Sequence, residues 1–312
     1  MILIVGASGV LGQKAAHHLL QAGHRVRVLS RTPTTATGLQ AAGAEVVAGD
    51  LTNPASLAAA VQGADTVLTA AHGLLGRGKY RSEQVDDAGH RALIDAAKAA
   101  GVRHFIYTSV HGARPDHPID FYRIKYRIEQ YLQQSGLPYS ILRPSAFMEW
   151  HAHNLLGKSI LEKGKTMIFG PGTSPTNFVA AHDVAQLVLQ LLPATAPRNR
   201  IIEIGGPTNP TRNEVAALYG RLAGIEPKVG HLPAGLLGVM SKVVSPLHPG
   251  IGRIMRMGAL AHTLNETLDM RDTLRTFPLQ LTHIDAFVLE QVARHKGPQA
   301  VGSHEAFSTS PA

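Results

Sequence analysis

The chain of 312 residues carries a formal net charge of +8 and contains no cysteine, which excludes disulfides, a thiolate nucleophile and a cysteine-ligated zinc site. Its length suits one large domain or two unequal ones with a sizeable core. The basic residues are scattered, with no helix-turn-helix pattern and no basic stripe with interleaved aromatics, so an anionic small molecule is favoured over nucleic acid as a partner.

The N-terminal residues form an apolar β-type run, which leaves no room for the basic and apolar regions of a signal peptide. We therefore expect a cytoplasmic protein, either monomeric or homodimeric. The most hydrophobic later stretch, 232–244, is broken by Pro233, Gly235, Gly238 and Lys242 and is too short to span a bilayer, so we expect no membrane partner.

The first half of the chain alternates short apolar runs with helical patterns. The runs are continuous and rich in β-branched residues, as in strands covered on both faces, and they lie at 2–5, 26–29, 45–48, 66–69, 104–108 and 139–142. Helices are expected between them, at 14–21, 33–42, 54–62, 82–100 and 121–135. Repeated βα units with right-handed crossovers predict the α/β class, with a doubly wound parallel Rossmann sheet.

After residue 145 the regular alternation of strands and helices ends. We expect a helix at 146–163, a strand at 165–169, a helix ending near 192, a strand at 200–204 and a helix at 211–223, followed by mostly helical chain. The predicted organisation is a nucleotide domain at 1–145, to which 176–208 returns, and a smaller, mostly helical substrate or lid domain at 146–175 and 209–295. Residues 296–312 read as a flexible tail.

A glycine loop joins the first strand to the first helix. Strand, glycine loop and helix present backbone N–H groups and a helix N-terminus to a phosphate. Gly6 would allow a sharp turn, Gly9 close approach of a pyrophosphate, and Gly12 close packing of helix on strand. The spacing is G-x-x-G-x-x-G, and the expected cofactor contacts are Gly6, Ser8, Gly9, Val10, Leu11 and Gly12.

The ends of the next strands carry further candidates for cofactor contacts. Arg31 stands where a dinucleotide fold meets the adenosine ribose, and without an acid between residues 30 and 43 it favours the 2′-phosphate of NADP(H) over NAD(H). Asp50, followed by Leu51, could accept from the adenine amino group or equally cap the next turn. Ala70 and Ala71 would let the cofactor pass close, whereas the adjacent His72 suits a plain loop residue better than a catalytic one.

For two later patterns we prefer a structural role to a functional one. The run Glu149-Trp-His151-Ala-His153 contains metal-ligand types without the His-Glu-x-x-His spacing, so we expect a pocket wall and no metal. An apolar helical face formed by Leu236, Leu237, Val239, Met240, Val243 and Val244 predicts core packing first, and a lid over an apolar substrate second.

Together these motifs resemble the NmrA-like, atypical short-chain dehydrogenase/reductases from Met1 to about Glu214. The matching segments are Gly6-Ala-Ser-Gly-Val-Leu-Gly12, Arg31, Asp50-Leu51, Tyr107-Thr-Ser109, Lys125, the run 135–144, Asn177-Phe-Val, Asp183-Val-Ala185 and Gly205-Gly-Pro207. The resemblance implies NADP(H) binding and reductase activity or cofactor sensing. It also implies that Pro144, Ser145 and Phe147 lie beside the nicotinamide.

The catalytic position departs from this family. Short-chain dehydrogenases use Tyr-x-x-x-Lys, and Lys125 matches the lysine that holds the ribose, while the tyrosine position holds Phe121. Tyr122 lies on a neighbouring part of the helical face and could substitute only with rotated geometry; a partly buried aromatic role is the alternative. Ser109 matches the family serine. We therefore expect Lys125, Tyr122 and Ser109 at the catalytic site, with Ser109 and Lys125 also touching the cofactor.

The sequence thus predicts an NADPH-dependent reductase of a small apolar carbonyl, quinone or conjugated acceptor. The alternative is a non-catalytic NADP(H)-sensing regulator, which Phe121 favours. A nucleotide-sugar epimerase is disfavoured because it too would need the tyrosine.

Overall fold

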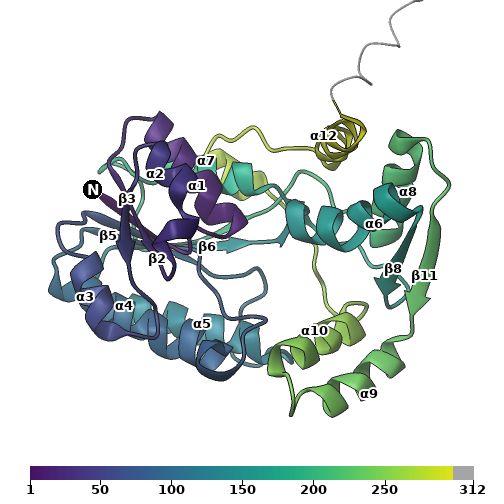
Figure 1. The fold of residues 1–312 in the computed structure, drawn as a ribbon, viewed down its shortest axis with the longest axis horizontal. Helices are drawn as coiled ribbons and strands as arrows, with labels where there is room; N and C mark the ends of the chain where they lie inside the picture. The colour runs from purple at the N-terminus through teal and green to yellow at the C-terminus, as the bar shows by residue number, and fades with distance from the viewer. Residues whose placement is uncertain (298–312) are drawn as a thin grey trace, which may run out of the picture.

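A seven-stranded parallel sheet forms the centre of the computed structural model, which describes residues 1–297 (Figure 1). The strand order is β10-β6-β5-β4-β1-β2-β3, and every neighbouring pair is parallel. The strands are β1 (Ile2–Val5), β2 (Val26–Ser30), β3 (Glu45–Ala48), β4 (Thr66–Thr69), β5 (His104–Thr108), β6 (Tyr139–Pro144) and β10 (Arg200–Ile204). Strands β1 to β3 are added toward one edge of the sheet, and strands β4 to β6 toward the other. The boundary between β1 and β4 is therefore the topological switch point, where ligands bind in such sheets.

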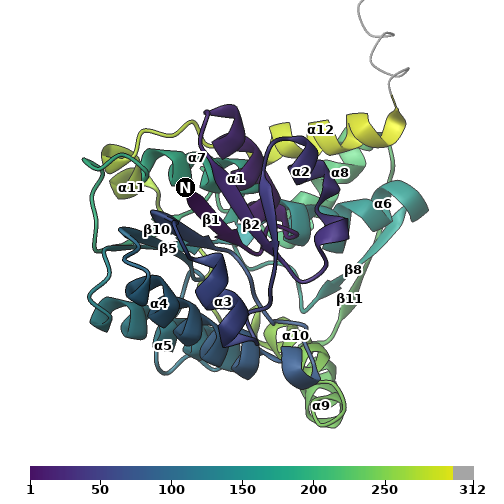
Figure 2. The same ribbon diagram turned by 60° about the vertical axis from the view of Figure 1, so that its left-hand side comes forward.

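Helices cover both faces of this sheet, as the continuous apolar runs require (Figures 1 and 2). One face carries η1 (Pro33–Thr35), α1 (Val10–Gln21), α2 (Thr37–Ala41), α7 (Ala181–Gln190) and α11 (Arg271–Thr276). The other carries α3 (Pro54–Ala60), the π-helical η3 (Glu83–Gly89), α4 (His90–Ala99) and α5 (Asp120–Gln134). Each layer has its own apolar cluster, with Ile4 and Val28 facing α1 and α7, and Leu3 and Phe105 facing α4 and α5. The fold is therefore the expected doubly wound Rossmann sheet.

A smaller, mostly helical region follows the sheet and has a third apolar cluster around Met148, Phe178 and Tyr219. Its elements are β7 (Ala146–Phe147), the π-helical η4 (Met148–Gly157), α6 (Lys158–Lys163), β8 (Lys165–Phe169), β9 (Phe178–Val179), α8 (Arg212–Ala223), β11 (Lys228–Leu232), α9 (Ala234–Val244), α10 (Pro249–Leu260) and α12 (Ile284–Lys296), with η2 (Gly78–Tyr80) in the loop after β4. In both views α9 lies at the edge of the molecule, beyond α10. Of the expected tail, residues 298–312 lie outside the described part.

One sequence-based expectation about elements is wrong, and two others are confirmed in part. The helix expected at 146–163 starts as strand β7, because the Ala146 N–H is bonded to the Asn177 carbonyl, and continues as π-helix before α6 begins. The chain after 223 is mostly helical, as expected, but it also contains strand β11, which pairs with β8. The apolar face expected in the core is largely exposed on α9. No helix within residues 1–297 is long and apolar enough to cross a membrane.

Candidate functional site

The glycine loop lies at the switch point and is shaped by close backbone contacts. Gly6 has φ +96°, and a Cβ there would lie 2.5 Å from the Ala71 nitrogen, so β1 can turn past β4 only without a side chain. A Cβ on Gly12 would lie 2.2 Å from the Gly6 carbonyl oxygen. The backbone of Ala70 and Ala71, both half-buried, therefore packs directly against the glycine loop.

The N-terminus of α1 is open to an anionic ligand. No side chain caps it within the described residues, its first turn contains no acid, and Ser8, Gly9 and Val10 are exposed. Leu11, in contrast, packs its side chain in the core and offers only its backbone N–H to this end. A helix of this length with exposed N–H groups and no competing carboxylate fits a pyrophosphate.

The expected adenosine end contains a second cation and an aromatic ring. The Arg31 guanidinium lies 4.6 Å and the Lys79 ammonium 5.0 Å from the centre of the Tyr80 ring. Asp50 Oδ1 accepts from the Thr52 N–H at 2.9 Å, which favours the turn-capping interpretation. Burial works to raise the pKa of Asp50, but Thr52, the Tyr80 hydroxyl and the charge of Arg31 outweigh it and lower the pKa. Leu51 packs in the core beneath α4.

Lys125 is a buried cation held between β5 and η3. Its Nζ donates to the Thr108 carbonyl at 3.1 Å and lies 3.6 Å from Asp86 Oδ1. It also lies 5.0 Å from the ring centre of Tyr107 and 5.5 Å from that of Phe121. Burial lowers the pKa of Lys125, an effect opposed by the negative charges of Asp86 and Glu129.

Asp86 is the fully buried partner of this lysine. Its Oδ2 accepts from the Ser82 hydroxyl at 2.5 Å and from the Gly73 N–H at 2.9 Å. Its Oδ1 has no hydrogen-bond partner among the described residues. That oxygen therefore interacts with the Lys125 ammonium by charge attraction alone. Nearby, His90 bonds Thr69, and burial lowers the pKa of His90 to about 4, so this ring is neutral. The cluster therefore contains one cation facing one carboxylate.

The two aromatic residues at the start of α5 have different surroundings. Phe121 is buried, with its ring beside Lys125 and 6.3 Å from that of His72. Tyr122 stacks on His117 with ring centres 4.0 Å apart. Burial, followed by the negative charge of Glu266, raises the pKa of the Tyr122 phenol, which makes it a weaker acid. The phenol expected as a substitute acid thus stacks on a loop histidine and faces the charges of the smaller region.

The side chains of His72 and His151 keep some contact with solvent. Many protein atoms nevertheless lie around them, and this burial lowers the pKa of both, to about 4 for His151. Accessible yet surrounded side chains are those expected to line a concave surface. His72 faces Asp86 and Lys125, whereas His151 and Tyr122 both feel the ion pair of Arg212 and Glu266 at 3.0 Å.

Ser109 is committed to a buried polar network. Its hydroxyl donates to Glu129 Oε1 at 2.5 Å, and Glu129 is paired with Arg143 at 2.6 Å. Arg143 continues to Glu203, which accepts from His111 at 2.8 Å. Because the Ser109 hydroxyl proton is used here, the serine serves the junction of β5, α5 and β6 in this structure.

The segment after β6 is fixed by Asn177. The buried Ser145 hydroxyl donates to Asn177 Oδ1 at 2.8 Å, the same oxygen that accepts from the Gly206 N–H. The Asn177 amide donates to the carbonyl of Gly206 at 3.1 Å. Pro144 is buried at the end of β6, and Phe147 is half-buried. The hydrogen bonds of Asn177 therefore fix the segment after β6, which the family resemblance assigns to the nicotinamide end of the cofactor.

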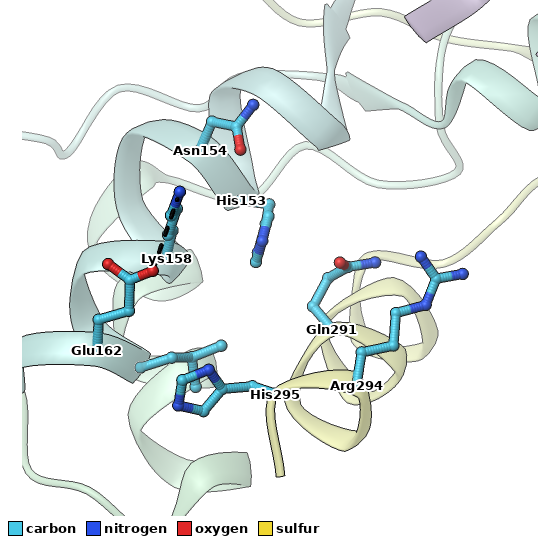
Figure 3. A pocket seen from close by; sticks show the side chains of 8 residues that line it. His153, Asn154, Lys158, Glu162, Gln291, Arg294 and His295 are labelled. Carbon is cyan, nitrogen blue, oxygen red and sulfur yellow. Dashed lines mark ion pairs between the residues drawn. The ribbon is translucent and has the colours of Figure 1, made fainter. Parts of the chain in front are cut away.

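A separate hollow of about 290 Å³ lies on the smaller region, between η4–α6 and α12 (Figure 3). His153, Lys158 and Arg294 line it, and none of its lining residues belongs to the glycine loop. Glu149, from the same histidine-containing run, accepts from the Ala181 N–H at 3.0 Å and so holds the start of α7. No group of three or more potential metal ligands occurs within residues 1–297.

Sequence reasoning did not single out Asp86, Tyr80, Lys79 or the role of Asn177. Lys79 and Tyr80 lie in the loop after β4, where the sequence has no apolar period to fix side-chain directions, and Asp86 lies in the helix expected at 82–100, whose pattern does not show which element its side chain meets. The basic run Arg77-Gly-Lys79-Tyr-Arg81 was the available signal, because it follows a strand on the same edge as Arg31.

The chain matches known proteins over most of its length. It is 30% identical over 300 residues to the Photosystem II assembly factor Ycf39 of Trieres chinensis, covering 94% of this chain and 93% of that protein. It is 33% identical over 227 residues to the NAD(P)H azoreductase of Xenophilus azovorans, covering 72% of this chain and 74% of that protein.

Solved structures share the fold. The NADPH-dependent quinone oxidoreductase QOR2 of Escherichia coli, complexed with NADPH, superposes with a TM-score of 0.77 at 23% identity, covering 94% of this chain and all of that one (100%). The Citrobacter sp. triphenylmethane reductase complexed with NADP(H) gives 0.74 at 20% identity, with 94% and 99% covered. The model of the NmrA-like family matches residues 1–253, and the chain belongs to the NmrA-like family.

Proposed function

We propose that this protein is an NADP(H)-dependent reductase that transfers hydride to a small, largely apolar carbonyl, quinone or conjugated acceptor. The observation that carries the proposal is the uncapped, exposed N-terminus of α1 behind a glycine loop at the switch point of the sheet. Backbone N–H groups and the helix dipole there favour a pyrophosphate. Relatives named as NAD(P)H azoreductase and NADPH-dependent quinone oxidoreductase support the reaction class.

NADP(H) is proposed over NAD(H) because positive charge gathers at the end of β2. Arg31 and Lys79 both approach the Tyr80 ring, so a 2′-phosphate placed there would meet two cations. Asp50 Oδ1 accepts from the Thr52 N–H, and its other lone pairs leave the carboxylate as a proposed acceptor for the adenine amino group. The remaining proposed contacts are the backbone of Gly6, Ser8, Gly9, Val10, Leu11 and Gly12, the edge formed by Leu51, Ala70, Ala71 and His72, and the segment Pro144, Ser145 and Phe147.

Lys125 is the proposed proton donor. When bound, the nicotinamide supplies the hydride, and the anion left on the acceptor then needs one proton for a balanced two-electron reduction. Burial makes the Lys125 ammonium a stronger acid, whereas it makes the Tyr122 phenol a weaker one. Asp86 keeps the lysine charged and oriented at 3.6 Å. Solvent reprotonates the amine after each turnover.

An apolar, planar acceptor fits the side chains around this lysine. The rings of Phe121 and His72 pack edge to face next to Lys125. Phe147, which follows β6, is half-buried. Aromatic rings bind flat unsaturated molecules by stacking and by burying apolar area. Ser109 is proposed as a positioning residue, since its hydroxyl is bonded to Glu129.

The second candidate function is a non-catalytic NADP(H)-sensing regulator. Phe121 favours it, because the family's proton-donating phenol is absent. The relative named as a photosystem II assembly factor also favours it, since that name describes assembly and not reduction.

Calorimetry and an acceptor screen test both parts of the proposal. NADP should bind more tightly than NAD, and Arg31→Ala should weaken NADP about 10- to 100-fold while leaving NAD unchanged, because a charge-assisted phosphate contact is lost. The matched control is Arg25→Ala, an exposed arginine just before β2, which should change neither. Equal NADP and NAD affinities in the parent protein would refute the 2′-phosphate assignment.

NADPH oxidation is then followed with quinones, aldehydes, enones and azo compounds. Turnover with at least one acceptor is expected. Tight NADPH binding without oxidation in the presence of any of them would leave the sensing function as the better account.

A further inference from the structure

Helix α9 presents an aliphatic stripe to solvent. Val239, Val243 and Leu247 are 62%, 67% and 85% exposed, and Leu236 and Met240 are exposed on the same side. Their spacing, 236, 240, 243 and 247, follows one face of a helix through its end. We name these five residues the α9 stripe.

The opposite face of α9 packs on α10. Leu237 and Ser241 are buried there, and the Ser241 hydroxyl donates to the Gly252 carbonyl of α10 at 2.8 Å. Most of the larger apolar side chains of α9 therefore face outward, while its packed face holds one leucine and a hydrogen-bonded serine, which is unusual for a helix surrounded by water. Figures 1 and 2 place α9 at the outer edge of the molecule, with α10 between it and α5.

The stripe continues beyond α9. Ile251 on α10 is exposed, and so is Leu75, whose backbone lies 2.7 Å from where a Cβ on Gly250 would stand. The apolar surface thus reaches from the tip of the α9–α10 hairpin to the loop after β4. A contiguous exposed apolar surface of this kind marks an interaction site.

The hairpin carries positive charge and no negative charge. Residues 227–265 contain no aspartate or glutamate. Lys242 and Arg256 are exposed, and neither makes an ion pair within residues 1–297. All charges that the hairpin itself carries are therefore positive, and the neighbouring carboxylates of Glu83 and Asp120 approach it at Arg253, with which both pair.

We propose that the α9 stripe docks on an anionic lipid bilayer, with its aliphatic side chains in the interfacial layer and Lys242 and Arg256 at the lipid phosphates. Convex aliphatic side chains with nearby cations and no carboxylates have the chemistry of a helix lying in a membrane interface. This is peripheral docking, which agrees with the lack of a spanning helix in the described chain. It differs from the expectation of no membrane partner.

A second copy of this chain fits the stripe less well. A two-fold interface places the same hairpin on both sides, so Lys242 would face residues 227–265 of the other copy, which include cations and no carboxylate. An anionic lipid surface supplies the missing counter-charge as well as an apolar layer. The charge pattern therefore favours the bilayer.

Vesicle co-sedimentation of the full chain tests the proposal. The protein should pellet with phosphatidylcholine vesicles containing phosphatidylglycerol and much less with phosphatidylcholine alone. Val243→Glu should weaken this binding by at least about tenfold, because an inserted valine is replaced by a charge that the lipid repels. Lys242→Gln together with Arg256→Gln should weaken binding to the anionic vesicles about 30-fold and leave the weak binding to neutral ones unchanged.

The matched control is Leu289→Glu, which places the same charge at an aliphatic side chain that is 56% exposed on α12. It should sediment like the parent protein, and all variants should keep parent-like NADPH binding. Failure to sediment with anionic vesicles, or equal loss in Leu289→Glu, would overturn the proposal. So would a dimer, seen by light scattering, that Val243→Glu disperses, since the stripe would then serve a second copy. None of these results bears on turnover.

Discussion

At the scale of single residues, the proposed proton donor can be separated from the neighbouring tyrosine. Lys125 is buried beside Phe121 and Asp86, whereas Tyr122 stacks on His117. Lys125→Ala should lower turnover by about 100-fold or more, because general acid catalysis contributes on that scale. Tyr122→Phe should stay within about twofold of the parent, measured as NADPH oxidation at saturating acceptor. A large loss in Tyr122→Phe would instead assign the proton to the phenol.

Asp86 gives a pH-dependent prediction at the same scale. Catalysis needs the charged form of Lys125, so activity should fall as pH rises through the pKa of this lysine. Burial lowers that pKa and the Asp86 charge opposes the effect, so Asp86→Asn should move the alkaline fall to lower pH by about one pH unit or more. The readout is the pH profile of turnover, which a purely structural role would not shift.

The control for this variant is the adjacent carboxylate. Asp87→Asn makes the same change at a residue that pairs with Arg91 and Arg127, both outside the Lys125 cluster. Its alkaline fall should coincide with that of the parent. Coinciding profiles for Asp86→Asn and Asp87→Asn would show that Asp86 does not hold the lysine.

The sequence placed Lys125 and Phe121 through a spaced motif, but it could not place what surrounds them. The family resemblance fixes their separation on one helix, whereas Asp86 reaches Lys125 across the gap between η3 and α5. The commitment of Ser109 to Glu129 was hidden for the same reason, since the two residues lie 20 positions apart on different elements. Contacts between elements depend on side-chain directions that a local pattern does not encode.

At the scale of elements, close packing of η4 on α8 depends on one glycine. A Cβ on Gly157 would lie 2.1 to 2.5 Å from atoms of the buried Tyr219 ring. Gly157→Ala should therefore destabilise the protein by about 2 kcal/mol, because the ring or the helix must move. Urea unfolding followed by circular dichroism measures the change.

Gly238→Ala provides the matched comparison, because nothing lies within 4 Å of where its Cβ would stand on α9. This variant should be unchanged or more stable by up to about 1 kcal/mol, since alanine is the better helix former. Equal destabilisation by both alanines would mean that the contact with Tyr219 does not limit the packing.

The success of sequence reasoning also varies between elements. Strands β1, β3, β4 and β5 were predicted with their exact ends, because continuous β-branched runs between glycines have few other uses in a covered sheet. Strand β11 was missed because Lys228–Leu232 has a weak local pattern and gains its partner, β8, only in the folded chain. For the same reason the first two residues of the helix expected at 146–163 instead form β7, which pairs with β9, while the rest is helical.

At the scale of the whole molecule, Arg253 joins the α9–α10 hairpin to the sheet region. Its guanidinium is buried and donates to both carboxylate oxygens of Asp120 on α5, at 2.8 and 2.5 Å, and to the Leu74 carbonyl at 2.9 Å. Leu74 belongs to the loop after β4 that also contains His72 and Gly73. One side chain therefore links the hairpin, the start of α5 and the edge of the proposed cofactor site.

Arg253→Met should open the hairpin locally without unfolding the sheet. The change keeps much of the side-chain volume but removes the ion pair and leaves the Leu74 carbonyl without this donor, so local opening becomes less costly. Limited proteolysis should cut within 233–265 about tenfold faster than in the parent, and NADPH affinity should fall because the loop after β4 is held less firmly. Arg256→Met removes an arginine from the exposed side of the same helix and should show neither change. Parent-like proteolysis of Arg253→Met would mean that apolar packing of α10, and not this ion pair, holds the hairpin in place.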